Sequence, residues 1–360
     1  MKIKFWLAII VILILSAGVV ALLQPPIQDR IVQRGVERQI EANQNIPDYG
    51  NNALDVVFCG TASPMGNGER AQQCIAIFAG PHFFIFDSGA RSTANVAQLG
   101  LPVERLSGIF LTHFHSDHIS SLGELHLLSW VRGREGKLNL YGGPGVSQVA
   151  DGFNLAYGQD YVYRTAHHGA DYLSPKNAGF VAKTIVAPPS GVTTVFDKDG
   201  VSVEVFEVIH PPIKPAYGYR ICYQARCVVV SGDTSASMNL QMVSRDADVL
   251  IHEVLHEDLT GYIAQGQTKA GMARIGKIIA DTPDYHTTPM NAAKIAQAAN
   301  VGLLVFTHFA PPPQNKLVEQ IYMRNLSSVL DVDKIILADD GLFLRLPVGE
   351  AGVVKRVSLK

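Results

Sequence analysis

The feature that most constrains this chain is the six-residue segment His113-Phe114-His115-Ser116-Asp117-His118. It directly follows the apolar run Gly108–Thr112 and directly precedes a helix-like segment, so we expect it at the carboxyl end of a strand. In extended backbone His113 and His115 point the same way, and the next turn brings Asp117 and His118 back toward them. Three imidazoles and a carboxylate this close together suit a borderline-soft divalent cation such as zinc. The segment therefore predicts a metal site at the edge of a sheet.

The rest of the chain supplies further side chains for such a site. From Asn52 onward, short apolar runs alternate with Gly, Pro and Asp, and helical segments are expected at 118–131 and 289–300, so the body mixes strands and helices. A hydrophobic share of 47% excludes a disordered chain. His210, Asp233 and His308 each follow a strand-like run. All three can therefore converge on one sheet edge with the six-residue segment.

Together these motifs resemble the metallo-β-lactamase fold superfamily, whose hallmark is HxHxDH at the end of a strand, over about Leu54 to Arg345. The further shared motifs are Gly60-Thr61-Ala62-Ser63-Pro64, Asp87-Ser88-Gly89, His210-Pro211, Ser231-Gly232-Asp233-Thr234 and Thr307-His308-Phe309. Within that superfamily the chain is similar to the ribonuclease Z and arylsulfatase-like branch. The motifs that indicate this branch are Gly218-Tyr219-Arg220, Ile251-His252-Glu253 and Tyr285-His286-Thr287-Thr288. The resemblance implies an α/β (α+β) class with a four-layer αββα fold over residues 52–347, followed by a C-terminal tail over 348–360.

The resemblance also implies two divalent metal ions, zinc in the first place, with manganese or iron as alternatives. One ion would be held by His113, His115 and His210, and the other by Asp117, His118 and His308. Asp233 would bridge the two ions. Two cations roughly 3.5 to 4 Å apart need a shared anionic ligand, and a bridging hydroxide would be the nucleophile. Asp117 would also be a candidate proton acceptor during the attack.

His286 is the residue that distinguishes the implied chemistry. In the enzymes that the chain resembles, a His at this place stabilises or protonates the leaving oxygen, which suits an imidazole near neutral pH. The alternative is a residue that merely begins the following helix. Glu253 and Asp87 are expected to orient metal ligands through hydrogen bonds.

One motif points to a different class of enzyme. His252-Glu253-Val254-Leu255-His256 satisfies HExxH, which in zinc proteases places both His on one helical face, with a third ligand downstream. Here the segment begins as the strand-like run Asp248–Ile251, and Leu259 stands where the extended form of the motif needs Gly. We therefore interpret this match as accidental.

Two departures from ribonuclease Z bear on the substrate. Only ten residues separate Arg220 from Ser231, where the resemblance would require a long arm that grips transfer RNA, and Ala310-Pro311-Pro312-Pro313 follows Phe309. Thirty basic and 32 acidic residues give a net charge of -2, which argues against a surface built for nucleic acid. The predicted substrate is therefore a small-molecule phosphodiester or sulfate ester, and a nucleic acid partner is not expected. A lactonase or thioesterase and a non-catalytic metal-binding scaffold are the alternatives, and a homodimer is left open.

The N-terminal 23 residues predict export. Phe5–Leu23 is 19 residues without a charge, after Lys2 and Lys4, so it is expected to be a transmembrane anchor, with a cleaved signal peptide as the alternative. Either way the lysines place the body outside the cytoplasm, in the periplasm or at the cell surface. Residues 24–51 have apolar residues at helical spacing among charges, which predicts an amphipathic stalk or a helix packed on the body.

Four cysteines, at positions 59, 74, 222 and 227, are an even number in such an oxidising setting. Cys222 and Cys227 flank a predicted tight turn and could bridge a hairpin. Free buried thiols are the alternative for all four.

Overall fold

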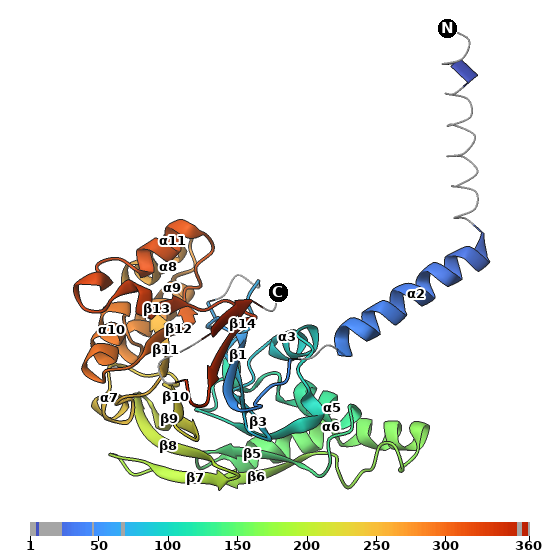
Figure 1. The fold of residues 1–360 in the computed structure, drawn as a ribbon. Coiled ribbons are helices and arrows are strands. Elements are labelled where there is room, and N and C mark those ends of the chain that lie inside the picture. Colours follow the sequence, from blue (N-terminus) through green and yellow to red (C-terminus); the bar gives the residue numbers. More distant parts are fainter. Residues whose placement is uncertain (1–4, 7–23, 45–46, 66–68, 351–354, 359–360) are drawn as a thin grey trace. The chain divides into compact units, whose positions relative to one another are not determined.

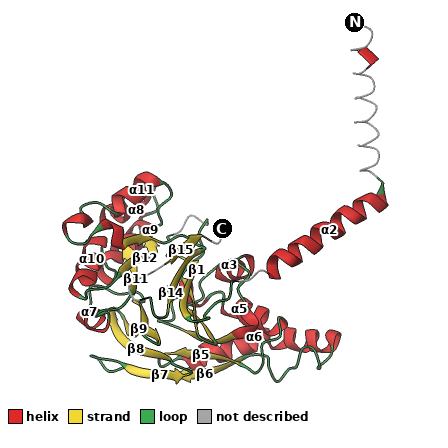
Figure 2. Cartoon of the chain, viewed as in Figure 1, coloured by secondary structure: helices red, strands yellow, loops and turns green. Residues whose placement is uncertain are grey.

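A computed structural model describes residues 5–6, 24–44, 47–65, 69–350 and 355–358 (Figure 1). The chain divides into two units, Met1–Pro47 and Asp48–Lys360, and each is described by itself. In the first unit, α2 (Pro25–Gln44) is a helix of 20 residues, drawn in red in Figure 2. The amphipathic pattern of residues 24–51 therefore corresponds to a helix over most of its length.

The predicted anchor or signal segment, Phe5–Leu23, lies almost entirely outside the described residues. Among the helices within the described ranges, none is both long and apolar enough to cross a membrane. Insertion of residues 5–23 into a membrane stays a prediction.

In the second unit, the described strands form two sheets (Figures 1 and 2). One sheet has eight strands in the order β15-β14-β1-β2-β3-β4-β5-β6, and the other has seven in the order β13-β12-β11-β10-β9-β8-β7. The bounds in the first sheet are β1 Ala53–Gly60, β2 Cys74–Ala79, β3 His82–Phe86, β4 Leu106–Phe110, β5 Leu138–Gly142, β6 Phe180–Thr184, β14 Leu342–Pro347 and β15 Lys355–Ser358. Those in the second are β7 Thr193–Lys198, β8 Val201–His210, β9 Ile213–Tyr223, β10 Arg226–Val230, β11 Val249–Leu255, β12 Leu303–Ala310 and β13 Ile335–Leu337.

Helices cover the outer faces of both sheets (Figure 1). Their bounds are α3 Ser92–Gln98, α4 Ser116–Ile119, α5 Leu122–Val131, α6 Val146–His168, α7 Met238–Val243, α8 Glu257–Lys269, α9 Ala273–Asp281, α10 Pro289–Ala298 and α11 Lys316–Tyr322. Short 3-10 turns are η1 Val103–Arg105, η2 Thr282–Tyr285, η3 Leu326–Ser328 and η4 Val332–Lys334.

The buried side chains form three apolar layers. The central layer lies between the sheets and contains residues such as Phe84, Val203 and Val305. The other two layers join each sheet to its helices, through Leu125 of α5 on one side and Ala292 of α10 on the other. Alternation along β8 sends successive side chains to opposite faces, so one strand contributes to two layers. This arrangement confirms the predicted four-layer αββα fold.

Helix prediction succeeded where the caps and the apolar pattern agreed. The expected helix at 289–300 is α10, whose N-cap Thr288 accepts a hydrogen bond from the Asn291 amide (3.3 Å) and whose first residue is Pro289. The expected helix at 118–131 is two helices, α4 and α5. The sequence did not reveal α6, because only Val146 and Ala150 of its 23 residues are buried and no apolar stripe marks it.

The C-terminal residues extend the first sheet. β15 pairs with β14 in antiparallel register, from Leu342 opposite Ser358 to Arg345 opposite Lys355. The segment predicted as a tail, 348–360, therefore contains a strand, and the compact unit runs to Lys360.

Two disulfides link neighbouring strands. Cys59 of β1 is bonded to Cys74 of β2, and Cys222 is bonded to Cys227 directly opposite it in the β9–β10 hairpin. No cysteine of the described residues is free. The structure thus selects the disulfide alternative, including the predicted hairpin bridge.

The two disulfides predict how many free thiols the protein has. Denatured, non-reduced protein treated with a thiol-specific reagent is expected to show no free thiol, and reduced protein four, because each sulfur is in a bond until reductant is added. A Cys222→Ser variant serves as the control and should expose one thiol without reduction. Four thiols in the non-reduced parent protein would contradict both bonds.

Candidate metal centre

The six-residue histidine segment lies where β4 ends. His113 and His115 occupy the loop after β4, and Asp117 and His118 belong to the short helix α4. His113, Asp117 and His118 are buried, whereas His115 is exposed. Gly89 makes this arrangement possible, because a Cβ atom there would lie 2.0 Å from the Asp117 carbonyl oxygen.

Three other strand ends bring the remaining predicted ligands. His210 ends β8, and Asp233 follows β10 after Gly232, whose φ of +62° and close approach to Tyr217 exclude a side chain. On β12, Thr307 pairs with Glu253 and Phe309 with Val254, so His308 is an extra residue with a φ of 47°. Such a bulge redirects a side chain, and here it accompanies the placement of His308 among the other donors.

All seven predicted ligands come together. Their donor atoms lie within 4.8 Å of one another in two groups: His113, His115 and His210, and Asp117, His118, Asp233 and His308. Asp233 Oδ2 is 3.9 Å from His113 and 4.0 Å from His210, and it is 3.3 Å from His118 and 3.4 Å from His308. The Asp233 carboxylate therefore stands between the two groups.

The donors satisfy one another only in part: Asp117 Oδ2 accepts from His308 Nε2 at 3.0 Å, but other donor atoms compete or lack a partner. His113 Nε2 and His210 Nε2 lie 2.9 Å and 3.5 Å from the same His115 Nδ1, and the buried His118 Nε2 has no hydrogen-bond partner. A buried polar atom without a partner costs about 1 to 3 kcal/mol. Imidazole and carboxylate donors gathered in this way fit a divalent metal site.

Hydrogen bonds behind the cluster fix which nitrogen faces it. Asp87 Oδ2 accepts from His118 Nδ1 at 2.8 Å, and the same carboxylate accepts from the amide and hydroxyl of Thr112 at 2.9 and 2.8 Å. His210 Nδ1 donates to the Tyr285 carbonyl at 3.0 Å. These bonds leave Nε2 of His118 and of His210 facing the cluster. The hydrogen bond from His118 to Asp87 is the orienting contact that the sequence predicted for Asp87.

The charges of the cluster suit a cation. Burial lowers the pKa of His113 and of His210, so both rings are neutral donors. Burial acts against ionisation of Asp233 as well, but His308 and His118 nonetheless hold its pKa well below the usual range. Burial opposes protonation of His118, but Asp233, Asp117 and Asp87 raise its pKa well above the usual range, so a metal ion would displace its proton.

His286 borders this cluster. It follows η2, and its ring centroid is 5.3 Å from that of His210 and 5.7 Å from that of His308. Its Nδ1 lies 3.2 Å from Oε1 of the buried Glu253 on β11. Burial lowers the pKa of His286, but the carboxylates of Glu253, Asp233 and Asp117 more than offset this and raise it to about 9. The ring therefore carries a proton that it can donate at the edge of the metal cluster.

The two alternative interpretations of nearby histidines do not fit the structure. Thr288, not His286, caps the following helix α10. His252 lies on strand β11, is fully buried and belongs to none of the donor groups found among the described residues. Since HExxH requires a helix, the match to the zinc protease motif is accidental, as predicted.

A cavity of about 300 Å³ opens onto the donors. Its lining residues are Ser63, Pro64, Met65, His115, Ser116, Asp117, Asp233, Ile278, Ile279, Thr282, Tyr285, His286, His308 and Ala310. Sequence analysis did not anticipate Ile278, Ile279 or Thr282. Their only sequence signal was the apolar pair Ile278-Ile279 ahead of the recognised segment Tyr285–Thr288.

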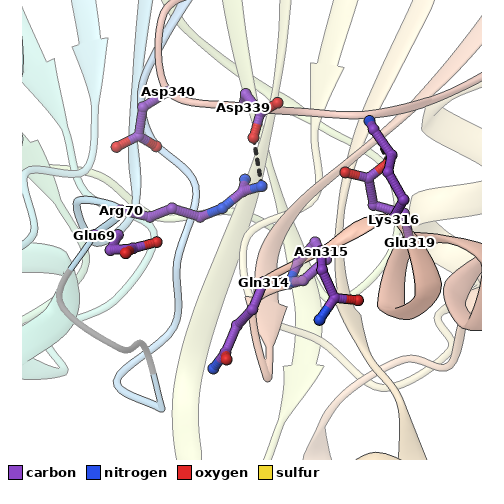
Figure 3. Close-up of a pocket in the computed structure, with 9 residues that line it drawn as sticks. Glu69, Arg70, Gln314, Asn315, Lys316, Glu319, Asp339 and Asp340 are labelled. Atoms are coloured by element: carbon purple, nitrogen blue, oxygen red, sulfur yellow. Dashed lines mark hydrogen bonds and ion pairs between the residues drawn. The ribbon is translucent and has the colours of Figure 1, made fainter.

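A larger cavity of about 500 Å³ lies elsewhere and has a different character. Figure 3 shows Arg70 reaching Asp339 across it, and Arg70 also donates to Thr61 at 3.0 Å. Lys316 pairs with Glu319 at 2.8 Å. The described residues that line this larger cavity include no histidine or cysteine, so the cavity offers no comparable set of donors for a transition metal.

Known proteins are similar to this chain in sequence and in fold. A family model for the metallo-beta-lactamase superfamily matches residues 67–308. Ribonuclease Z from Mycobacterium bovis is 34% identical over 261 residues, which cover 72% of this chain and 86% of that protein. These relatives are named as ribonucleases, so the comparisons do not support the expectation that this chain has no nucleic acid partner.

Two solved structures are similar at the level of the fold. The metallo-beta-lactamase fold protein YhfI from Bacillus subtilis has a TM-score of 0.57 at 19% identity, and the short form of human tRNase Z has 0.55 at 20% identity. Each match covers 81% of this chain and 99% of the other. The family model and the ribonuclease Z relative show that the chain belongs to the metallo-beta-lactamase superfamily, in its ribonuclease Z-like branch.

Proposed function

We propose that this protein is a dinuclear metal-dependent phosphodiesterase. The observation that carries the proposal is the position of Asp233, whose Oδ2 lies within 4.0 Å of histidines from both donor groups. A carboxylate between two sets of ligands is what a pair of cations requires to offset their mutual repulsion.

The two ions would be divided as the donor groups are. His113, His115 and His210 would hold one, Asp117, His118 and His308 the other, and Asp233 would bridge them. When bound, such ions lower the pKa of a coordinated water molecule to about 7 and neutralise charge on a phosphoryl group. Zinc is the proposed metal, because imidazole donors dominate the set.

The chain's own groups would handle the leaving oxygen. His286 is positioned to donate a proton to it, and Glu253 holds His286 protonated and in place. Glu253 Oε1 also accepts from the amides of Thr234 (3.2 Å) and Thr287 (2.9 Å). The buried Glu253 carboxylate thus links Thr234, which follows Asp233, to Thr287, which follows His286. This link supports a fixed distance between the proposed bridging ligand and the proposed acid. Asp117 would accept a proton during attack.

The proposed substrate is a small phosphodiester. The β9–β10 hairpin turns tightly at Gln224 and Ala225, with no insertion that could grip RNA, and none of the described residues lining the cavity is Lys or Arg. Binding of a polyanion normally draws on such side chains. RNA is the substrate that the names of the relatives suggest, and it is therefore the alternative to be tested.

We also propose an oxidising compartment for the protein. The support is the pair of disulfides, because such bonds persist mainly outside the reducing cytosol. Thiol labelling in intact cells tests this: four reactive cysteines in the native protein would place it in a reducing compartment.

The function is tested with a substrate panel. The zinc-loaded protein, compared with the chelated protein, is expected to hydrolyse bis-p-nitrophenyl phosphate faster than p-nitrophenyl sulfate, an acyl-homoserine lactone, a thioester or an RNA with a 3′ extension. Turnover of the lactone or thioester alone would overturn the phosphodiesterase proposal. Preference for RNA would retain the chemistry and overturn the small substrate.

The metal cluster predicts a stoichiometry. Two zinc ions per chain are expected by elemental analysis, and Asp233→Asn should lower this to one or fewer, because the bridging charge is lost. Asp339→Asn removes an exposed carboxylate outside the cluster and should leave two ions bound. A parent protein that holds well under one ion, even with added zinc, would favour a non-catalytic scaffold.

The role of His286 predicts a dependence on the leaving group. His286→Gln is expected to lower kcat by about 10² to 10⁴ for a diester with a poor alkoxide leaving group. The loss should be much smaller for p-nitrophenolate, which departs without a proton, and zinc content should stay unchanged. An equal loss for both leaving groups would show that His286 does not act as the acid.

A further inference from the structure

Apolar side chains line part of the metal cavity. They are Ile278 and Ile279 of α9, and Pro64 and Met65 from the loop after β1. The same cavity is lined by the metal-ligand candidates His115, Asp117, Asp233 and His308. The cavity therefore combines a polar reaction centre with an apolar wall.

The protein itself does not bury Ile278, which is 56% exposed, and it leaves Ile279 half-buried. Ile275, one turn earlier and outside the cavity lining, is 45% exposed. A surface helix normally turns such residues toward the core. Within α9, the charged Lys277 pairs with Asp281. The apolar surface at the cavity is thus left for another molecule to cover.

The charge of the lining indicates what that molecule is. None of the described lining residues is a Lys or Arg, so none of these side chains would offer a bound phosphate group the permanent positive charge that a polyanion needs. The substituent attached to the phosphate would meet Ile278 and Ile279. Apolar groups gain about 0.8 kcal/mol for each methylene removed from water, which is close to fourfold in affinity.

Resting on the proposed phosphodiesterase function, we propose that the wall formed by Ile278 and Ile279 binds an alkyl or aryl substituent of the substrate. Ile278 is then a specificity-determining residue. The substrate class is a phosphodiester that carries an apolar group, and not one whose substituents are further charged units.

Binding of simple phosphonates tests this directly. Calorimetry on the zinc-loaded protein compares methylphosphonate with butylphosphonate, which share one charged head. Butylphosphonate is expected to bind about tenfold more tightly, less than the roughly 60-fold that full burial of three methylenes would give. Ile278→Gln should reduce this preference to threefold or less.

Ile275→Gln is the matched control, since Ile275 is similarly exposed on the same helix but does not line the cavity. It should keep the tenfold preference. Equal affinity for the two phosphonates in the parent protein, or the same preference in both variants, would overturn the inference. Hydrolysis of bis-p-nitrophenyl phosphate is measured alongside: if it is absent while the phosphonate preference depends on Ile278, the proposed function fails and the apolar wall stands.

Discussion

The structure depends on one electrostatic constraint, which is that two sets of imidazoles share the carboxylate of Asp233. These donors come from positions more than 190 residues apart, between His113 and His308, so no local segment can assemble them. Only the packing of two sheets, with the relevant strand ends at one edge, brings the donor atoms of each group within 4.8 Å of one another. The apolar layer between the sheets therefore does more than stabilise the fold, because it sets the distances on which metal binding relies.

Buried polar groups around the centre form one connected support. Asp87 fixes the ring of His118 from the side of the first sheet, whereas Glu253 fixes His286 and two backbone amides from the side of the second. Each of these carboxylates is buried, so its hydrogen bonds act in a medium where they are strong and where losing one is costly. The reaction centre is thus held from both sheets.

Local patterns predicted the mixture of strands and helices and the cluster, and the family resemblance implied the four layers. The segment His113–His118 follows a buried strand, and His210 and Asp233 follow similar runs, so a shared sheet edge was a sound expectation. What the sequence could not show was the bulge at His308, since the left-handed backbone there depends on pairing with β11. The helix α6 was missed because most of it has no apolar stripe, and the contribution of α9 to the cavity depends on tertiary packing alone.

The two sides of the cavity are held in different ways. Pro64 and Met65 belong to a connection whose ends are joined by the Cys59–Cys74 bond, so the covalent link limits how far this side can move. Ile278 and Ile279 belong to α9, which packs on α8 and is tied by no disulfide among the described residues. Any adjustment to substituents of different size therefore costs least on the α9 side. Substitutions selected for a new substrate should therefore accumulate in residues 273–281, while the side closed by the disulfide keeps its shape.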